Sequence, residues 1–329
     1  MTNDPWLDKQ LTSVKDLLKQ AAEKVKENKF AEAEAPLKEA ELILDSVDGP
    51  HEEALRLRAM IYNNMGALAV QSNAPDKALA FQHKLLESFE GLAALGGANP
   101  YLLERVNTLI QIGLLSAGAR KPQDGVTASR KALELMQSFP VVTPQAQIQA
   151  HTLDMLANYH LGLNLHIMGD QKAEATLTLQ KAAERALAMM KAGQAVPHVV
   201  VELLGNAARV HADQKLYDRS YTYARRGADV ALALFEKSKQ QLFLQQYVNL
   251  EMDLVTYAER TQQFSKGEDS LFKVLDVLPG DPNVIKRGEA YYESLLKLDD
   301  ATLTKGGLPR DEVESSLKDV RARKKPAMA

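Results

Sequence analysis

The residues that could do chemistry in this sequence are mainly amides, and two of them stand in an unexpected place. Asn63 and Asn64 lie in the stretch "IYNNMGALAV", where Ile61, Met65 and Leu68 recur at the spacing of an amphipathic helix. Asparagine is a mediocre helix former because its side-chain amide competes for backbone hydrogen bonds. The pair therefore marks either a plain exposed polar face or a surface that contacts a ligand. An amide both donates and accepts hydrogen bonds, so it can hold the main chain of an extended peptide.

Residue patterns that support catalytic or metal chemistry do not occur in this sequence. It contains no cysteine, which excludes disulfides, thiolate metal sites and cysteine nucleophiles. None of the seven histidines has a glutamate three residues before it, and no HExxH motif is present. The phosphate-binding motifs GxxxxGK[ST] and GxGxxG and the nucleophile elbow GxSxG are also missing. We therefore expect no enzymatic activity, no metal and no cofactor.

The composition places the chain among packed, water-soluble proteins. Hydrophobic residues make up 45% and charged residues 25% of the 329 residues, and the formal net charge is −3. A nucleic-acid-binding protein usually shows a clear basic excess, so nucleic acid is not an expected partner. The start, "MTNDPWLDKQ", lacks the features of a Sec-type signal peptide, and no apolar stretch is long enough to span a membrane. We expect a cytoplasmic protein.

Glycine and proline interrupt an otherwise helical sequence at regular places. Strong breaks are "DGP" at 48–50, "GGANP" at 96–100, "PVVTP" at 140–144, "GQAVP" at 193–197 and "PGDP" at 279–282. Weaker breaks lie between them, at 27–33, 72–78, 119–125, 168–175, 214–220 and 262–267. Strong and weak breaks alternate over most of the chain, which predicts stacked helical hairpins.

The weak breaks recur with a nearly constant period. A small residue closes each one: Ala33, Ala78, Gly125, Ala173, Ser220 and Gly267. The steps between these anchor residues are 45, 47, 48, 47 and 47 residues. A period in this range is typical of repeat proteins, in which each unit buries its apolar face against the next.

These breaks resemble those of tetratricopeptide repeats. The sequence has an aromatic residue and then a small one at Phe30 and Ala33, at Tyr217 and Ser220, and at Phe264 and Gly267. Twelve residues before an anchor, the family's small position in the first helix holds Gly66, Gly113 and Ala208, and Pro279 occupies its terminal proline position. The resemblance covers residues 7–298. It departs from the family in its period, which exceeds the usual 34 residues, and in Val255, which replaces a small residue.

The resemblance implies an all-α protein, a right-handed α-solenoid of about six hairpins with a C-terminal capping helix. The expected repeat domain is 1–298, with units at 7–48, 51–95, 100–139, 144–192, 197–239 and 240–279 and the capping helix at 283–298. Residues 299–329 are expected to form a C-terminal helix and a basic tail.

In this family the first helix of each unit lines a concave groove, so the resemblance also selects candidate binding residues. Counting back from the anchors places eight polar side chains on the inner face: Asn63, Asn64, Asn107, Gln111, Asn206, Arg209, Asn249 and Asp253. Groove asparagines of peptide-binding members hold the partner's backbone, which implies the same role here. The alternative is that these positions are polar only because the groove is wet. The carboxylate clamp of chaperone-binding members is broken, since Leu18 and Ala22 occupy two of its positions.

The resemblance implies a non-catalytic adaptor or scaffold that binds a peptide or helix of a partner protein. Two alternatives stay open: a regulator that senses a peptide by changing its superhelical pitch, and a structural subunit that self-associates. The sequence leaves the partner and the oligomeric state open. A second candidate surface combines Tyr223 with Arg225 and Arg226 on the outer face, whereas Tyr217 and Tyr221 are expected in the core.

Overall fold

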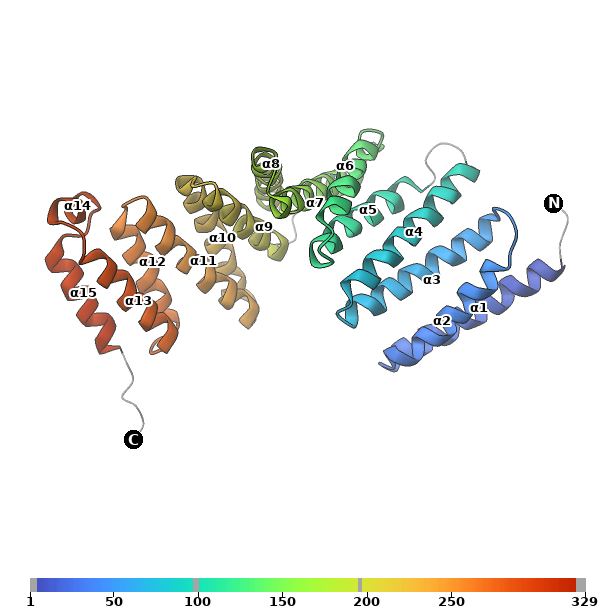
Figure 1. Ribbon diagram of the computed structural model, residues 1–329, viewed down its shortest axis with the longest axis horizontal. Helices are drawn as coiled ribbons and strands as arrows, with labels where there is room; N and C mark the ends of the chain where they lie inside the picture. The colour runs from blue at the N-terminus through green and yellow to red at the C-terminus, as the bar shows by residue number, and fades with distance from the viewer. Residues whose placement is uncertain (1–4, 97–100, 195–196, 324–329) are drawn as a thin grey trace. The chain divides into compact units, whose positions relative to one another are not determined.

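The structure is a computed structural model that describes residues 5–96, 101–194 and 197–323. Most of the predicted break at 96–100, part of that at 193–197, and the end of the basic tail lie outside these residues. Over the described ranges the chain forms helices and no strand (Figure 1). The all-α class predicted from the sequence is confirmed.

The helices follow one another with short connections. Their bounds are α1 Pro5–Lys26, α2 Phe30–Asp45, α3 Glu52–Gln71, α4 Pro75–Gly96, α5 Leu102–Gly118, α6 Pro122–Met136, α7 Pro144–Met168, α8 Lys172–Lys191, α9 Pro197–Asp213, α10 Tyr217–Ser238, α11 Gln241–Arg260, α12 Phe264–Val277, α13 Pro282–Leu295, α14 Asp300–Lys305 and α15 Arg310–Ala322. Several begin with proline at their first turn, where the missing N–H is no loss.

The chain divides into two compact units, residues 1–182 and 183–329, and the division falls within α8. In the first unit α1 packs on α2, α3 on α4 and α5 on α6, and α2, α4 and α6 each also contact the helix that follows. In the second unit α10 packs on both α9 and α11, and α11 packs on α12. The last described helix, α15, covers α13. Each unit is therefore a series of antiparallel helical hairpins.

Within the first unit, some glycines lie where a neighbouring helix leaves no room for a side chain. A Cβ added to Gly125 of α6 would stand 2.4 Å from Cγ of Asn164 in α7. Asn164 is fully buried, and its Nδ2 donates to the carbonyl oxygens of Gly113 in α5 and His160, each at 2.8 Å. One buried amide thus joins α7 to α5 at a point where glycine leaves room for it.

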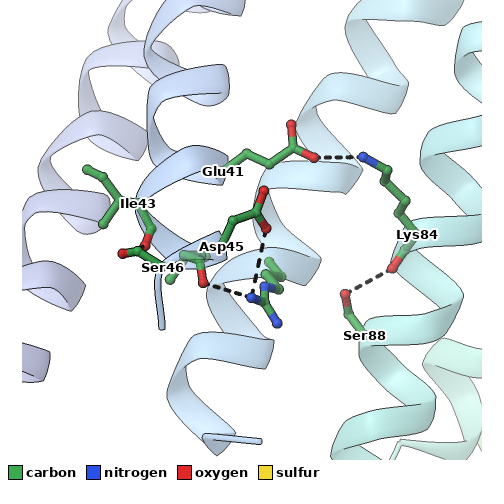
Figure 2. Close-up of polar contacts among 8 residues, drawn as sticks. Glu41, Ile43, Asp45, Ser46, Lys84 and Ser88 are labelled. Carbon is green, nitrogen blue, oxygen red and sulfur yellow. Dashed lines mark hydrogen bonds and ion pairs between the residues drawn. The ribbon is translucent and has the colours of Figure 1, made fainter. Parts of the chain in front are cut away.

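The first two hairpins are joined by polar contacts at the end of α2 (Figure 2). Lys84 Nζ of α4 donates to Glu41 Oε1 of α2 at 2.7 Å. Arg58 of α3 donates to the carbonyl oxygen of Leu44 at 2.7 Å, and its guanidinium lies 3.9 Å from Asp45. Partly exposed ion pairs of this kind contribute little free energy each, so the apolar contact beneath them holds the hairpins together.

The second unit contains a buried ion pair where the sequence suggested a surface patch. Glu251 of α11 is fully buried, and Arg225 of α10 binds both of its carboxylate oxygens, the first at 2.7 Å from Nη1. Arg225 also donates to Ser270 of α12 at 3.2 Å. Tyr223 is buried against His211. The prediction of an outer contact patch with Tyr223 and Arg225 is therefore wrong, because α10 packs against helices on both sides and these residues face them.

Replacing Gly125 by alanine should destabilise the first unit, because the new methyl group would overlap the buried amide of Asn164. We expect a loss of about 1–3 kcal/mol in the free energy of unfolding, measured by urea denaturation. Gly118→Ala is the matched control, since the nearest atom to an added Cβ there is 3.6 Å away. Equal stability of the two variants would contradict the close packing.

The stability of the protein should fall as the pH drops from about 6.5 towards 4. Burial lowers the pKa of His160 from its usual 6.5 to about 4, so in this range the unfolded chain binds a proton that the folded chain excludes. Each pH unit then costs up to about 1.4 kcal/mol through this residue. Urea denaturation between pH 6.5 and 5 should show a shallower dependence for His160→Leu than for the wild type. The exposed His198→Leu serves as control, and an unchanged slope in His160→Leu would refute the assignment.

Candidate functional site

A groove in the first unit lies between α3 and α5, with α4 as its floor, and encloses about 750 Å³. Three small residues of α3, Ala59, Gly66 and Ala67, line its wall and leave the α4 side chains accessible beneath them. The apolar lining consists of Ala59, Met60, Ala67, Val70, Leu85, Phe89, Leu92 and Leu115. Met60 and Val70 are about half exposed, so this face of α3 offers apolar surface to a ligand.

Three of the predicted binding residues meet in this α3–α5 groove. Asn63 comes from α3, and Asn107 and Gln111 come from one face of α5, one turn apart. All three side chains are exposed. None of them hydrogen-bonds to another residue of the described part of the chain, so their amides are available to a ligand.

The lining of the α3–α5 groove includes aromatic and charged residues that contact one another. Arg56 Nε donates to the hydroxyl oxygen of Tyr101 at 3.2 Å, and its Nη2 donates to Glu52 at 2.5 Å. The Tyr101 ring stacks on Phe89 with centroids 6.1 Å apart. Because Arg56 is already paired, only Glu104 adds an unpaired charge to the lining, and the groove is close to neutral.

A second groove lies in the second unit, between α11 and α13, and encloses about 490 Å³. It brings together the predicted residues Arg209, Asn249 and Asp253, and adds Asp281 and Arg287 to them. Unlike the α3–α5 groove, this α11–α13 groove is lined mainly by charged and polar groups.

The polar groups of the α11–α13 groove are largely engaged with one another. Asn249 accepts a hydrogen bond from Gln245 at 2.9 Å. Arg209 Nε lies 3.5 Å from Asp253 Oδ2, close enough for an ion pair but without a hydrogen bond. Burial raises the pKa of Asp253, while Arg209 and Arg287 act to lower it. The amides and charges here are less available to a ligand than those of the first unit.

The two asparagines at equivalent inner positions, Asn64 and Asn206, line neither groove. Both are half-buried. Asn206 accepts a hydrogen bond from Arg209 Nη1 at 3.1 Å and so helps to orient that guanidinium. Of the conspicuous pair in α3, only Asn63 faces the groove, because adjacent residues of a helix point in different directions.

One groove residue, Gln82 of α4, does not follow from counting positions on the first helix of each unit. It belongs to a second helix, and it forms part of the groove floor. The signal for it is nevertheless present in the sequence. Ala78, Gln82, Leu85 and Phe89 recur at helical spacing, so a glutamine interrupts an otherwise apolar stripe.

The described residues offer no group of three histidine, aspartate or glutamate side chains placed to hold a metal ion. None of the described helices is both long and apolar enough to cross a membrane.

Truncating the groove amides should not weaken the fold. We expect Asn63→Ala and Asn107→Ala to leave the free energy of unfolding unchanged or to raise it by a few tenths of a kcal/mol, because alanine is the better helix former. Asn164→Ala, which removes a fully buried amide whose Nδ2 donates two hydrogen bonds, should cost about 1–3 kcal/mol under the same urea denaturation. A comparable loss in Asn63→Ala would show that this residue serves packing rather than binding.

Comparison with known proteins places the fold but no activity. Residues 165–325 match the model of a family of unknown function, DUF6483, and no curated protein matches the chain. The apo form of RapI is similar over 94% of this chain and 98% of its own, with a TM-score of 0.55 at 12% sequence identity. A signal transduction ATPase with numerous domains from Pyrococcus horikoshii, which has a tetratricopeptide repeat sensor, is similar over 81% of this chain. That match covers 37% of the ATPase chain, with a TM-score of 0.58 at 11% identity. The chain therefore has a tetratricopeptide-like helical repeat fold.

Proposed function

We propose that this chain is a non-catalytic adaptor of the long-period tetratricopeptide type, which binds a segment of a partner protein in the α3–α5 groove. The observation that carries the proposal is the set of three unengaged amides, Asn63, Asn107 and Gln111, around an apolar floor. The absence of cysteine supports action in a reducing compartment such as the cytoplasm.

The arrangement suits an extended peptide. Amides on both walls can donate to and accept from a peptide main chain without regard to its sequence. Apolar side chains of the same peptide would lie against Leu85, Phe89 and Leu92 below. Met60 and Val70 are ten residues apart on α3, which corresponds to about 15 Å of helix and about five residues of extended chain.

We place the binding site in the first unit rather than the second because the amides of its groove have no hydrogen-bond partners within the described part of the protein. In the α11–α13 groove, Asn249 and Arg209 already have partners within the protein, and a ligand would have to displace them. In the α3–α5 groove, no such exchange is needed. Net hydrogen-bond gain on binding is therefore larger in the first unit.

Filling the α3–α5 groove should abolish peptide binding. Peptides would be selected from a random displayed library on the full chain and titrated by fluorescence anisotropy. We expect Ala67→Trp, which places a large side chain in the groove, to weaken binding at least tenfold. Ala80→Trp, at an exposed position of α4 outside the groove, is the matched control.

A set of amide variants distinguishes the amides that line the α3–α5 groove from the asparagines that line neither groove. The triple variant Asn63→Ala, Asn107→Ala, Gln111→Ala should lose binding, whereas Asn64→Ala, Asn206→Ala should retain it. If every selected peptide bound Ala67→Trp and the triple variant as tightly as the wild type, the working surface would lie elsewhere and the proposal would be wrong.

A further inference from the structure

Gln82 is a buried polar side chain at the floor of the α3–α5 groove. It is 9% exposed. No residue of the described chain hydrogen-bonds to its side chain, although a carboxamide offers two donors and an acceptor. Its neighbours on the same face of α4, Leu79 and Leu85, are apolar and cannot satisfy it. Because the described residues supply no partner, this amide can be satisfied only from the groove.

The amide of Gln82 is accessible from the groove. Gly66 of α3 lies directly over Gln82, and a Cβ at Gly66 would stand 3.1 Å from Gln82 Nε2. The missing side chain therefore leaves the amide uncovered on the groove side. Both residues line the same groove, with Asn63 and Asn107 nearer its exposed rim. The groove thus carries amides at two depths.

We propose that Gln82 is a specificity-determining residue, which pairs with an asparagine or glutamine side chain of the bound partner segment. This inference rests on the proposed function of the α3–α5 groove. The rim amides can reach the partner's main chain, whereas the floor can be reached only by a side chain that points into the groove. The complementary group for a carboxamide is a second carboxamide, because each then donates one hydrogen bond and accepts one.

Other side chains fit the floor less well. A charged group would be buried beside Gln82 with no opposite charge nearby, since the charged lining residues Arg56 and Glu104 lie near the N-terminal ends of α3 and α5. A serine or threonine hydroxyl has a single donor and does not match the planar donor and acceptor pair of the amide. An apolar side chain would leave Gln82 unsatisfied, which is the penalty that discriminates against it.

The test is a selection followed by a double-mutant cycle. Peptides from a random displayed library are selected on the full chain and on Gln82→Met, which keeps the shape of the side chain and removes its polar group. We expect wild-type selections to be enriched in asparagine or glutamine at one position, and Gln82→Met selections to be enriched in leucine or methionine there. Gln71→Met, an exposed position of α3 outside the groove, should behave as wild type.

Synthetic peptides from the selection then measure the coupling free energy between Gln82 and the asparagine of the peptide. Changing the peptide's asparagine to leucine, or the protein's Gln82 to methionine, should each weaken binding about tenfold, and the two changes together should cost little more than either alone. The melting temperature of Gln82→Met should equal or exceed that of the wild type, because an unpaired buried amide is removed.

The outcomes separate this inference from the proposed function. Selected peptides that lose affinity for Ala67→Trp but show no amide preference, and that bind Gln82→Met unchanged, would overturn the role of Gln82 and leave the groove intact. Peptides that bind Ala67→Trp as tightly as wild type would overturn both. A lower melting temperature for Gln82→Met would show that its amide is bonded within the fold, and would also overturn the inference.

Discussion

The structure depends on close approach between helices that cannot bury their apolar faces within a single hairpin. Each hairpin must pack on the next, and the helices approach closely only where one of them carries a small side chain. Gly125 faces Asn164, Gly162 faces Leu179, and Gly267 faces Tyr291, each at a distance that leaves no room for a Cβ. The small residues of the repeat are thus the points at which neighbouring helices are held in register.

Polar groups in the core reinforce this register at a few positions. Asn164 bonds to the main chain of α5 and of its own helix, so it fits only one placement of α7. In the second unit, the buried pair of Glu251 and Arg225 joins α11 to α10 and, through Ser270, to α12. Burying both charges costs desolvation free energy, so the pair adds little net stability. A packing that separated them would nevertheless leave a buried charge without a partner and be strongly disfavoured.

The same use of small residues creates the candidate site. Ala59, Gly66 and Ala67 lie where larger side chains of α3 would cover α4, and so a groove forms between α3 and α5. Hydrogen bonding then distinguishes this groove from the one in the second unit. Asn63, Asn107 and Gln111 of the α3–α5 groove are unengaged by the described residues, whereas Asn249 of the α11–α13 groove accepts a hydrogen bond from Gln245. A groove of similar sequence pattern can therefore be a ready binding surface or a self-satisfied one.

The helical class and the positions of the breaks between helices could be predicted from the sequence, because both depend on interactions within a few residues. Proline and glycine end helices wherever they stand, and the spacing of apolar residues reports which helix face is buried. The same counting singled out Asn63, Asn107 and Gln111 as inner-face residues, and the structure brings these three together. It also singled out Asn64 and Asn206, which line neither groove.

The tertiary structure decided which polar residues are bonded, buried or exposed to the groove, which the periodicity of the sequence could not. Asn249 and Asn206 are bonded by Gln245 and Arg209, four and three residues away on their own helices, but the spacing alone does not fix the rotamers that form these bonds. Charge and aromaticity are common at interfaces and suggested a surface role for Tyr223 and Arg225, yet packing on two sides buries Tyr223 and leaves Arg225 only partly exposed. Gln82 became a site residue only because Gly66 lies above it. The sequence by itself determined the helices and the faces they bury, since these follow from interactions within a few residues. Contacts between helices decided which polar groups are buried and which line the groove, as at Arg225 and Gln82, since these contacts join residues that are far apart in the sequence.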